Sequence, residues 1–314
     1  METFAFALSV TGPIFLTLII GYWLTRIGLL REAFVDDASR LVFLVTLPVL
    51  LFSEIFTSDA ELGQELPLLA AGLLGTLITI PLAWAAARPL ARGDRSAFIQ
   101  GAFRGNLGII GLAWAANAYG SSGLAQAALL MAVVTMLYNL AAVTLFAVYS
   151  QDAPGKWNRG SWGKLARDIA QNPLIVAIVL ALVCRQAGLQ LPAILLQTGD
   201  YLASITLPLA LLCIGASLDF SLLRRSSLTA FGAVGFKLLL VPAVLLTFGW
   251  LFRLPPQSMG VLLLLAAAPS ATVSFIMARA MGGNSQLAAN IVALSTLLSI
   301  VTASLGLALL QVLY

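Results

Sequence analysis

Ten apolar stretches, each long enough to cross a lipid bilayer, take up nearly the whole of this 314-residue chain. A helix needs about 20 mostly apolar residues to span roughly 30 Å of hydrocarbon. Hydrophobic residues make up 60% of the sequence and charged residues only 10%, which excludes an ordinary soluble domain. We therefore expect an all-α membrane protein with ten transmembrane helices, at residues 6–29, 38–57, 66–88, 97–119, 124–149, 168–189, 198–218, 228–252, 258–281 and 286–312.

The distribution of basic residues predicts how these spans are oriented. Twelve of the seventeen Lys and Arg residues follow spans 1, 3, 5 and 7, whereas the loops after the even-numbered spans hold only Arg185 and Arg253. Basic residues near span ends collect on the cytoplasmic side, so both termini are expected to face outward. The net charge of +4 is dispersed over these helix ends, and no nucleic-acid partner is expected.

An internal repeat divides the chain into two halves. The segments "TGPIFLTLIIGYWLTRIGLL" and "QNPLIVAIVLALVCRQAGLQ" align without a gap, and "TLPVLLF" aligns with "TLPLALL" at the same separation. Five spans per repeat is an odd number, so the second copy must enter from the opposite side. We expect two inverted five-helix repeats, at residues 1–150 and 168–314, joined by a cytoplasmic basic loop at 151–167.

The fourth and ninth spans contain residues that interrupt helices. Span 4 carries "GNLGIIGL" around Asn106, and span 9 carries "AAAPSATVSF" around Pro269. Glycine tolerates non-helical backbone, and proline removes a hydrogen-bond donor. We expect the two breaks to cross near the bilayer midplane and to offer free N–H groups to a carboxylate, with Asn106 adding a side-chain donor. The alternative for the glycines is close helix packing through small residues.

Four charged residues fall within the predicted spans. Arg104, Lys237 and Arg279 are candidates for attracting an anion, although Arg104 and Arg279 could instead extend to the cytoplasmic surface. Glu54 is a candidate coupling group or a solvated helix end. The predicted spans thus contain three basic residues and one acidic residue, which favours an organic anion over a cation as the substrate. The other polar residues of the spans are expected to form interhelical hydrogen bonds (Gln100, Asn117 and Asn139) or to lie at the interface (Asp200 and Asp219).

These motifs give the chain a resemblance to the auxin efflux carrier family. The resemblance rests on "GNLGIIGL" in span 4, "NP" at the start of span 6, "TLP" in span 7 and the proline in span 9, and it covers essentially the whole chain. It implies broken, crossing fourth and ninth helices, elevator-like alternating access and a homodimer. It also implies a bacterial inner (cytoplasmic) membrane, with both termini on the periplasmic side. The family's span 4 often reads "GNTGFIGLP", whereas this chain has Ala113 in place of the proline.

The function expected is secondary transport of a small organic anion, such as an auxin-like acid or a malonate-type dicarboxylate. The chain has no His, no nucleophile motif and no phosphate-binding loop, so we expect neither an enzyme nor an ATP-driven pump. No cofactor or metal site is expected, and the cysteines Cys184 and Cys213 are interpreted as buried apolar residues. The alternatives are a sodium-coupled symporter of the bile-acid-transporter type and a channel or sensor. The substrate-binding candidates are Arg104, Gly105, Asn106, Gly108, Lys237, Pro269, Ser270 and Thr272, and the coupling candidate is Glu54.

Overall fold

The computed structural model describes residues 2–58, 62–149, 163, 167, 170–219, 227–280 and 283–313, so the predicted basic loop lies almost entirely outside the described residues. This part of the chain is helical and contains no strand. Seven of its helices are long and apolar enough to cross a membrane, and two shorter apolar helices accompany them. The prediction of an all-α membrane protein is confirmed.

Helices take up most of the described residues in both halves of the chain. The described elements of the first half are α1 (Glu2–Arg26), α2 (Glu32–Leu41), α3 (Leu47–Thr57), α4 (Leu62–Ala86), α5 (Arg92–Phe103) and α6 (Leu112–Tyr149). Those of the second half are α8 (Pro173–Gln186), α9 (Ala193–Ala216), α10 (Leu228–Gly235), α11 (Val241–Leu251), α12 (Pro256–Ala267), α13 (Val273–Ala280) and α14 (Ser285–Leu313). Three π-helical segments, Val42–Thr46, Leu107–Gly111 and Phe236–Leu240, connect α2 to α3, lead into α6 and connect α10 to α11.

Two of the π-helical segments are followed by a proline in the first turn of the next helix, Pro48 in α3 and Pro242 in α11. A proline inside a continuous helix cannot donate its backbone hydrogen bond and collides with the preceding turn. A local widening to π geometry accommodates such an interruption, and π segments of this kind frequently mark functional sites. Lys237 lies in the second of these segments.

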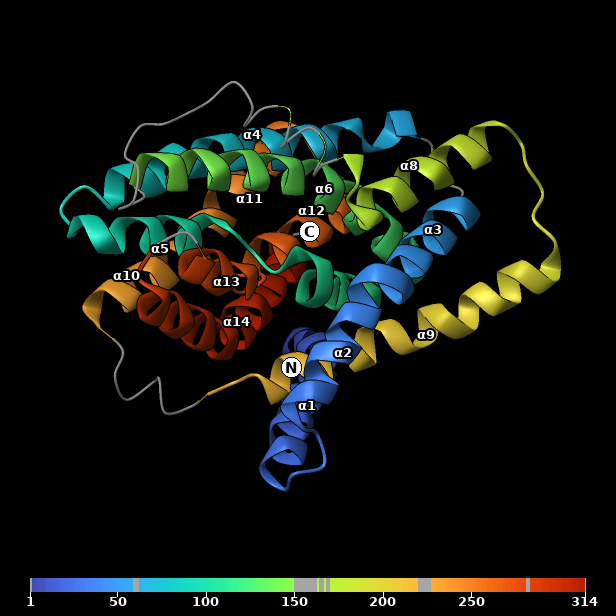
Figure 1. The fold of residues 1–314 in the computed structure, drawn as a ribbon. Helices are drawn as coiled ribbons and strands as arrows, with labels where there is room; N and C mark the ends of the chain where they lie inside the picture. Colours follow the sequence, from blue (N-terminus) through green and yellow to red (C-terminus); the bar gives the residue numbers. More distant parts are fainter. Residues whose placement is uncertain are drawn as a thin grey trace.

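The helices form two groups, and each group draws on both halves of the sequence. In one group, α1 and α3 pack on α9, and α3 also packs on α8. In the other, α4 packs on α6 and α11, and α14 packs on α10, α12 and α13. Figure 1 shows α3, α8 and α9 on the right and α5, α10 and α13 on the left. Chain order therefore does not decide which helices lie together.

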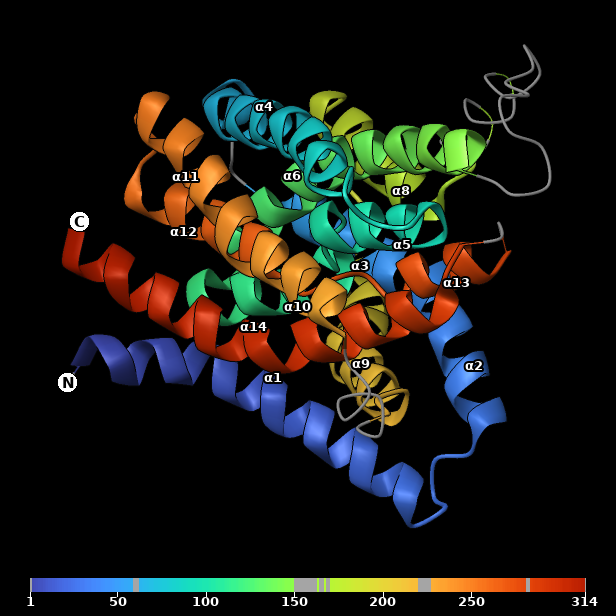
Figure 2. The same cartoon turned by 90° about the vertical axis from the view of Figure 1, so that its left-hand side faces the viewer.

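The two groups meet along α1 and α14, which carry the two termini. Figure 2 shows these helices side by side, with both termini at the same end of the molecule. The hydroxyls of Thr11 and Ser304 are 2.8 Å apart across this contact, and both side chains are buried. A hydrogen bond between them satisfies two polar groups that would be costly to leave unpaired in an apolar interior.

Helices α1 and α9 approach so closely that glycine is required on both. A Cβ atom on Gly21 would collide with the backbone carbonyl oxygen of Leu212, and one on Gly215 would collide with that of Leu18. Small residues are the usual means by which membrane helices bring their backbones together. This pair of contacts holds the first group together.

Candidate functional site

The helix predicted as span 4 is interrupted within the glycine-rich motif. Helix α5 ends at Phe103, and the chain continues through Arg104 (φ −82°, ψ 105°) and Asn106 (φ −79°, ψ 68°) before helical geometry resumes at Leu107. Helix α6 then continues through the predicted span 5. The loop predicted after span 4 is reduced to a sharp bend at Gly120, whose φ of 62° suits a residue without a side chain.

The helix predicted as span 9 is interrupted at its proline. Helix α12 ends at Ala267, Ala268 is extended (φ −54°, ψ 135°), and α13 begins at Val273. Proline disfavours helical geometry in the residue before it, which explains why the chain leaves the helix at Ala268.

The two interruptions pair with each other, and we call residues 104–106 and 268–272 the crossover. The Asn106 N–H donates to the Pro269 carbonyl at 2.7 Å, and the Ala271 N–H donates to the Arg104 carbonyl at 3.0 Å. Gly105 and Ser270 thereby form an isolated antiparallel bridge. Unpaired backbone groups are very costly at membrane depth, so each break supplies the partners that the other needs.

Serine side chains fix the crossover to its neighbours. The Ser270 hydroxyl donates to the Gly101 carbonyl at 2.6 Å, and the Ser270 N–H donates to the Ser295 hydroxyl of α14 at 3.0 Å. The expectation of free N–H groups at the breaks is therefore wrong for Asn106, Ser270 and Ala271, because Asn106 and Ala271 donate to the opposite break and Ser270 donates to Ser295.

A cavity of about 630 Å³ lies against the crossover and between the two groups of helices. It is lined by residues 104–109 and 271–273 together with residues of α2, α3, α6 and α9. We call this space the crossover cavity. Its exposed end carries Asp36, Ser39 and Arg40. Most of the lining is apolar, which is typical of a ligand site in which a few polar groups set the orientation.

Arg104 is the charged residue that the crossover presents to this cavity. Its side chain is only 8% exposed, and one guanidinium nitrogen donates to the Asn139 side-chain oxygen at 3.0 Å. A second nitrogen lies 3.8 Å from the Met277 sulfur, and the guanidinium carbon lies 6.0 Å from the centre of the Tyr138 ring. None of the described residues that bond to Arg104 is an acid. Guanidinium groups of this kind bind carboxylates through paired hydrogen bonds.

Lys237 reaches the crossover from the opposite side. Its side chain is fully buried, and its Nζ donates to the Ala266 carbonyl of α12 at 2.6 Å. It does not line the crossover cavity.

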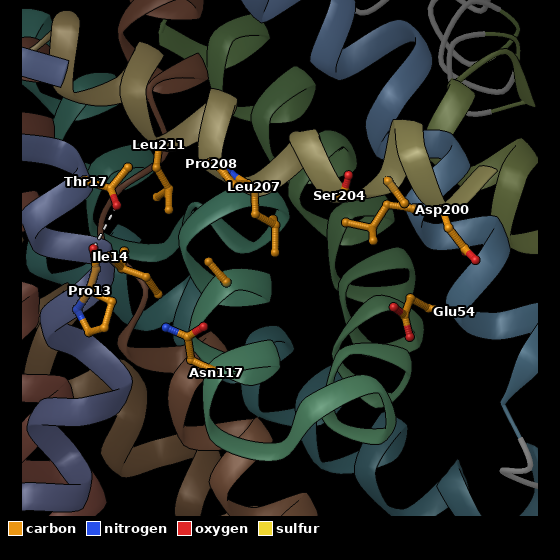
Figure 3. Close-up of a pocket in the computed structure, with 13 residues that line it drawn as sticks. Pro13, Ile14, Thr17, Glu54, Asn117, Asp200, Ser204, Leu207, Pro208 and Leu211 are labelled. Atoms are coloured by element: carbon orange, nitrogen blue, oxygen red, sulfur yellow. Dashed lines mark hydrogen bonds between the residues drawn. The ribbon is translucent and has the colours of Figure 1, made fainter. Parts of the chain in front are cut away.

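A second cavity, of about 480 Å³, lies further along the same helices. Its polar lining includes Glu54 of α3, Asn117 of α6 and Asp200 of α9. Figure 3 shows Glu54 and Asp200 together at one end, with Pro13 and Thr17 of α1 at the other. In α3 and α9 the two cavities use successive turns, so they lie one after the other along these helices.

The structure separates the predicted site residues into four places. Arg104, Gly105, Asn106, Gly108 and Thr272 line the crossover cavity. Pro269 and Ser270 are buried within the crossover and do not line that cavity, and Lys237 lies behind it. Glu54 lies in the second cavity, with Asp200, which the sequence placed at the interface.

Three residues around Arg104 were not predicted from the sequence to be its neighbours. Tyr138 and Met277 have no sequence signal that connects them to Arg104, because they belong to α6 and α13. Asn139 was expected to bond between helices, which it does, but its partner is the arginine.

A transmembrane α-helical protein with paired helix breaks beside a cavity belongs to the class of membrane transporters, and comparison with known proteins bears this out. Residues 9–307 match the family described as membrane transport protein, and the chain belongs to this family. The resemblance to auxin efflux carriers is thereby confirmed, and the protein is a transporter and not an enzyme.

Two archaeal proteins illustrate how far the similarity extends. An uncharacterized transporter of Methanothermobacter thermautotrophicus is 25% identical over 287 residues, which cover 90% of this chain and 92% of that protein. The uncharacterized transporter MJ1031 of Methanocaldococcus jannaschii is 24% identical over 272 residues, covering 84% and 86% of the two chains. The match to the family, at residues 9–307, spans both interruptions.

Removing the Ser270 hydroxyl tests how firmly the crossover is held. We expect Ser270→Ala to lower the free energy of unfolding by roughly 1–3 kcal/mol, because the buried Gly101 carbonyl loses its hydroxyl donor. Thermal denaturation of the detergent-purified protein measures this change. Ser9→Ala is the control, since the exposed Ser9 hydroxyl bonds only within its own helix. Equal stability of the two variants would show that the serine does not fix the crossover.

Proposed function

We propose that the protein is a secondary transporter of a small organic anion, which binds in the crossover cavity. The observation that carries this proposal is Arg104, a buried cation in an apolar cavity whose described bonding partners include no acid. A carboxylate would supply the missing negative charge. Asn106 and Thr272 line the same cavity and offer additional side-chain hydrogen bonds.

The fold proposed for this function is a pair of inverted five-helix repeats with ten membrane helices. Corresponding helix ends support it: the chain turns at Gly28 after α1 and at Gly188 after α8, with φ values of 79° and 64°. After each of these helices, an equivalent backbone bond closes the turn, from Leu29 to Leu24 and from Leu189 to Cys184. Both termini lie at one end of the molecule, as ten passes require (Figure 2). The homodimer and the bacterial inner membrane implied by the resemblance stay predictions.

Alternating access is proposed to arise from sliding of the second helix group, which carries the crossover, against the first. The two cavities support this mechanism, because each lies between the groups and they follow one another along α3 and α9. In the orientation predicted from the basic residues, Arg40 is near the cytoplasm, and the crossover cavity opens to that side. The second cavity would then lead toward the outside.

Counterflow in proteoliposomes tests the transport mechanism. Vesicles preloaded with unlabelled malonate or indole-3-acetate are expected to accumulate the labelled anion transiently, in sodium-free buffer, because a carrier exchanges its substrate across the membrane. Linear, non-saturable entry without counterflow would indicate a channel and contradict the proposal. A strict sodium requirement would favour the sodium-coupled alternative.

Placing an acid beside Arg104 tests its role directly. Asn139→Asp would set a carboxylate where the amide oxygen now lies 3.0 Å from the guanidinium. We expect this variant to bind malonate at least about tenfold more weakly, because its own carboxylate competes for Arg104. Isothermal titration calorimetry of the purified protein measures the affinity.

Asn139→Ala is the matched control for this experiment. It removes the same hydrogen bond but leaves the arginine charge unpaired, so its loss of affinity should be smaller. Wild-type affinity in Asn139→Asp would show that the anion does not bind at Arg104.

A further inference from the structure

Lys237 is among the largest fully buried side chains in the described part of the protein. It projects from the π-helical segment Phe236–Leu240, and its Nζ has one recorded hydrogen bond, to the Ala266 carbonyl near the end of α12. Moving an ammonium ion from water into an apolar interior is costly unless an anion accompanies it. Side-chain packing alone therefore does not explain why a lysine occupies this buried position.

Gly105 lies next to this amine and also lines the crossover cavity. A Cβ atom on Gly105 would be 3.2 Å from Lys237 Nζ. The next residues on either side, Arg104 and Asn106, also line the cavity. An anion bound at these three residues would thus lie close to the Lys237 amine without touching it.

Among the described residues, the helices packed against the segment of Lys237 contain a single acid, Asp94, at the end of α5 remote from the crossover. The π-helical segment packs against α5, α10, α11, α12 and α14. The last four of these helices contain no Asp, Glu, Lys, Arg, Cys or Tyr. In α5 the ionisable residues are Arg92, Asp94 and Arg95, in its first turn, and Arg104 follows its last residue. Across the crossover, Tyr138 of α6 hydrogen-bonds the Gly105 backbone and contacts Arg104.

The hydrogen bond to Ala266 is compatible with both protonation states of the lysine. A neutral amine has two N–H groups and a lone pair, and an ammonium ion has three N–H groups. Either form can donate to the Ala266 carbonyl. Protonation of Lys237 therefore changes the charge beside the crossover without breaking its hydrogen bond to the Ala266 carbonyl.

We propose that Lys237 is the proton-binding group of the transporter, so that each anion bound in the crossover cavity is accompanied by one proton on Nζ. The proton is taken up from the solvent and is held by the nitrogen lone pair. It returns to water when the anion leaves. This inference rests on the proposed binding of an anion at Arg104 and adds the identity of the coupling group.

Proton uptake on binding tests the inference. Purified full-length protein in weakly buffered, sodium-free detergent solution is mixed with malonate or indole-3-acetate, and a pH indicator reports the protons taken up. Somewhere between about pH 6 and about pH 9, we expect the wild type to take up nearly one proton for each anion that it binds. In that same range, the affinity for the anion should fall by up to about tenfold for each unit of rising pH, because binding consumes a proton.

Two variants separate proton binding from a purely structural role. Lys237→Met keeps a long side chain without charge and should bind the anion more weakly, with no proton uptake. Lys237→Arg keeps a permanent charge and should bind the anion with no proton uptake and no comparable pH dependence. Thermal denaturation confirms that each variant is folded, and an unfolded variant is replaced by Lys237→Gln.

The outcomes distinguish this inference from the proposed function. Anion binding by the wild type without proton uptake at any pH would overturn the role of Lys237 but leave anion transport intact. Unchanged proton uptake in a folded Lys237 variant would also overturn the role of Lys237 and leave anion transport intact. If neither anion binds the wild type, the proposed function fails and the inference fails with it.

Discussion

Replacing Arg104 by glutamine is expected to weaken anion binding by at least about a hundredfold, which corresponds to about 2.7 kcal/mol. Removing one partner of a buried, hydrogen-bonded charge pair typically costs 2–5 kcal/mol or more. Arg104 is 8% exposed and lines a largely apolar cavity, where the charge of a bound anion is screened less than in bulk water. Calorimetric titration with malonate measures the loss.

Two further variants show whether charge alone or the guanidinium geometry is responsible. Arg104→Lys keeps the charge but loses the paired donors, so its affinity should fall between those of the wild type and Arg104→Gln. Arg279→Gln is the control, because Arg279 lies in α13 but its side chain is exposed and outside the crossover cavity. If Arg104→Gln and Arg279→Gln bind malonate equally well, the anion site is elsewhere.

The second large effect is expected at the contact between α1 and α9. Gly21→Ala should destabilise the protein by at least about 3 kcal/mol, at the upper end of the range for overpacking. The added methyl group would meet the carbonyl oxygen of Leu212 and would lie 2.9 Å from that residue's carbonyl carbon and Cα. Backbone atoms of a helix cannot turn aside as a side chain can, so α1 and α9 must separate.

The same helix supplies a matched control for this prediction. Gly12 also belongs to α1, and a Cβ atom there would have no neighbour within 4 Å. Gly12→Ala should therefore be neutral or slightly stabilising, because alanine is the better helix former. Both variants are compared by the yield of monodisperse protein and by thermal denaturation in the same detergent. Equal behaviour would mean that α1 and α9 are not closely packed.

Much of the crossover was predictable because its interruptions are local properties of the sequence. Pro269 lacks a backbone donor, and the glycines around Asn106 tolerate non-helical backbone. Arg104 was also predictable as a candidate, since a charge within an apolar span is costly and usually has a function. These inferences need only the residue and its neighbours in the chain.

The partners of these residues were not predictable in the same way. The donors of Asn106 and Ala271 were expected to be free for a ligand, but they bind the opposite break. Glu54 was predicted only as a coupling candidate or a solvated helix end, and the structure places it in a different cavity from Arg104. Their positions depend on which turns of α3, α6 and α9 face each cavity, and a periodic run of apolar residues does not specify this.

The sequence by itself thus determined a helical membrane protein, its family and the places where two helices break, because hydrophobicity, glycine and proline act locally. The tertiary structure decided that the breaks pair through Gly105 and Ser270, that Arg104 faces a cavity and that Lys237 lies behind it. These features depend on contacts between helices far apart in the chain. Long-range packing selects among many arrangements that the same apolar spans would allow.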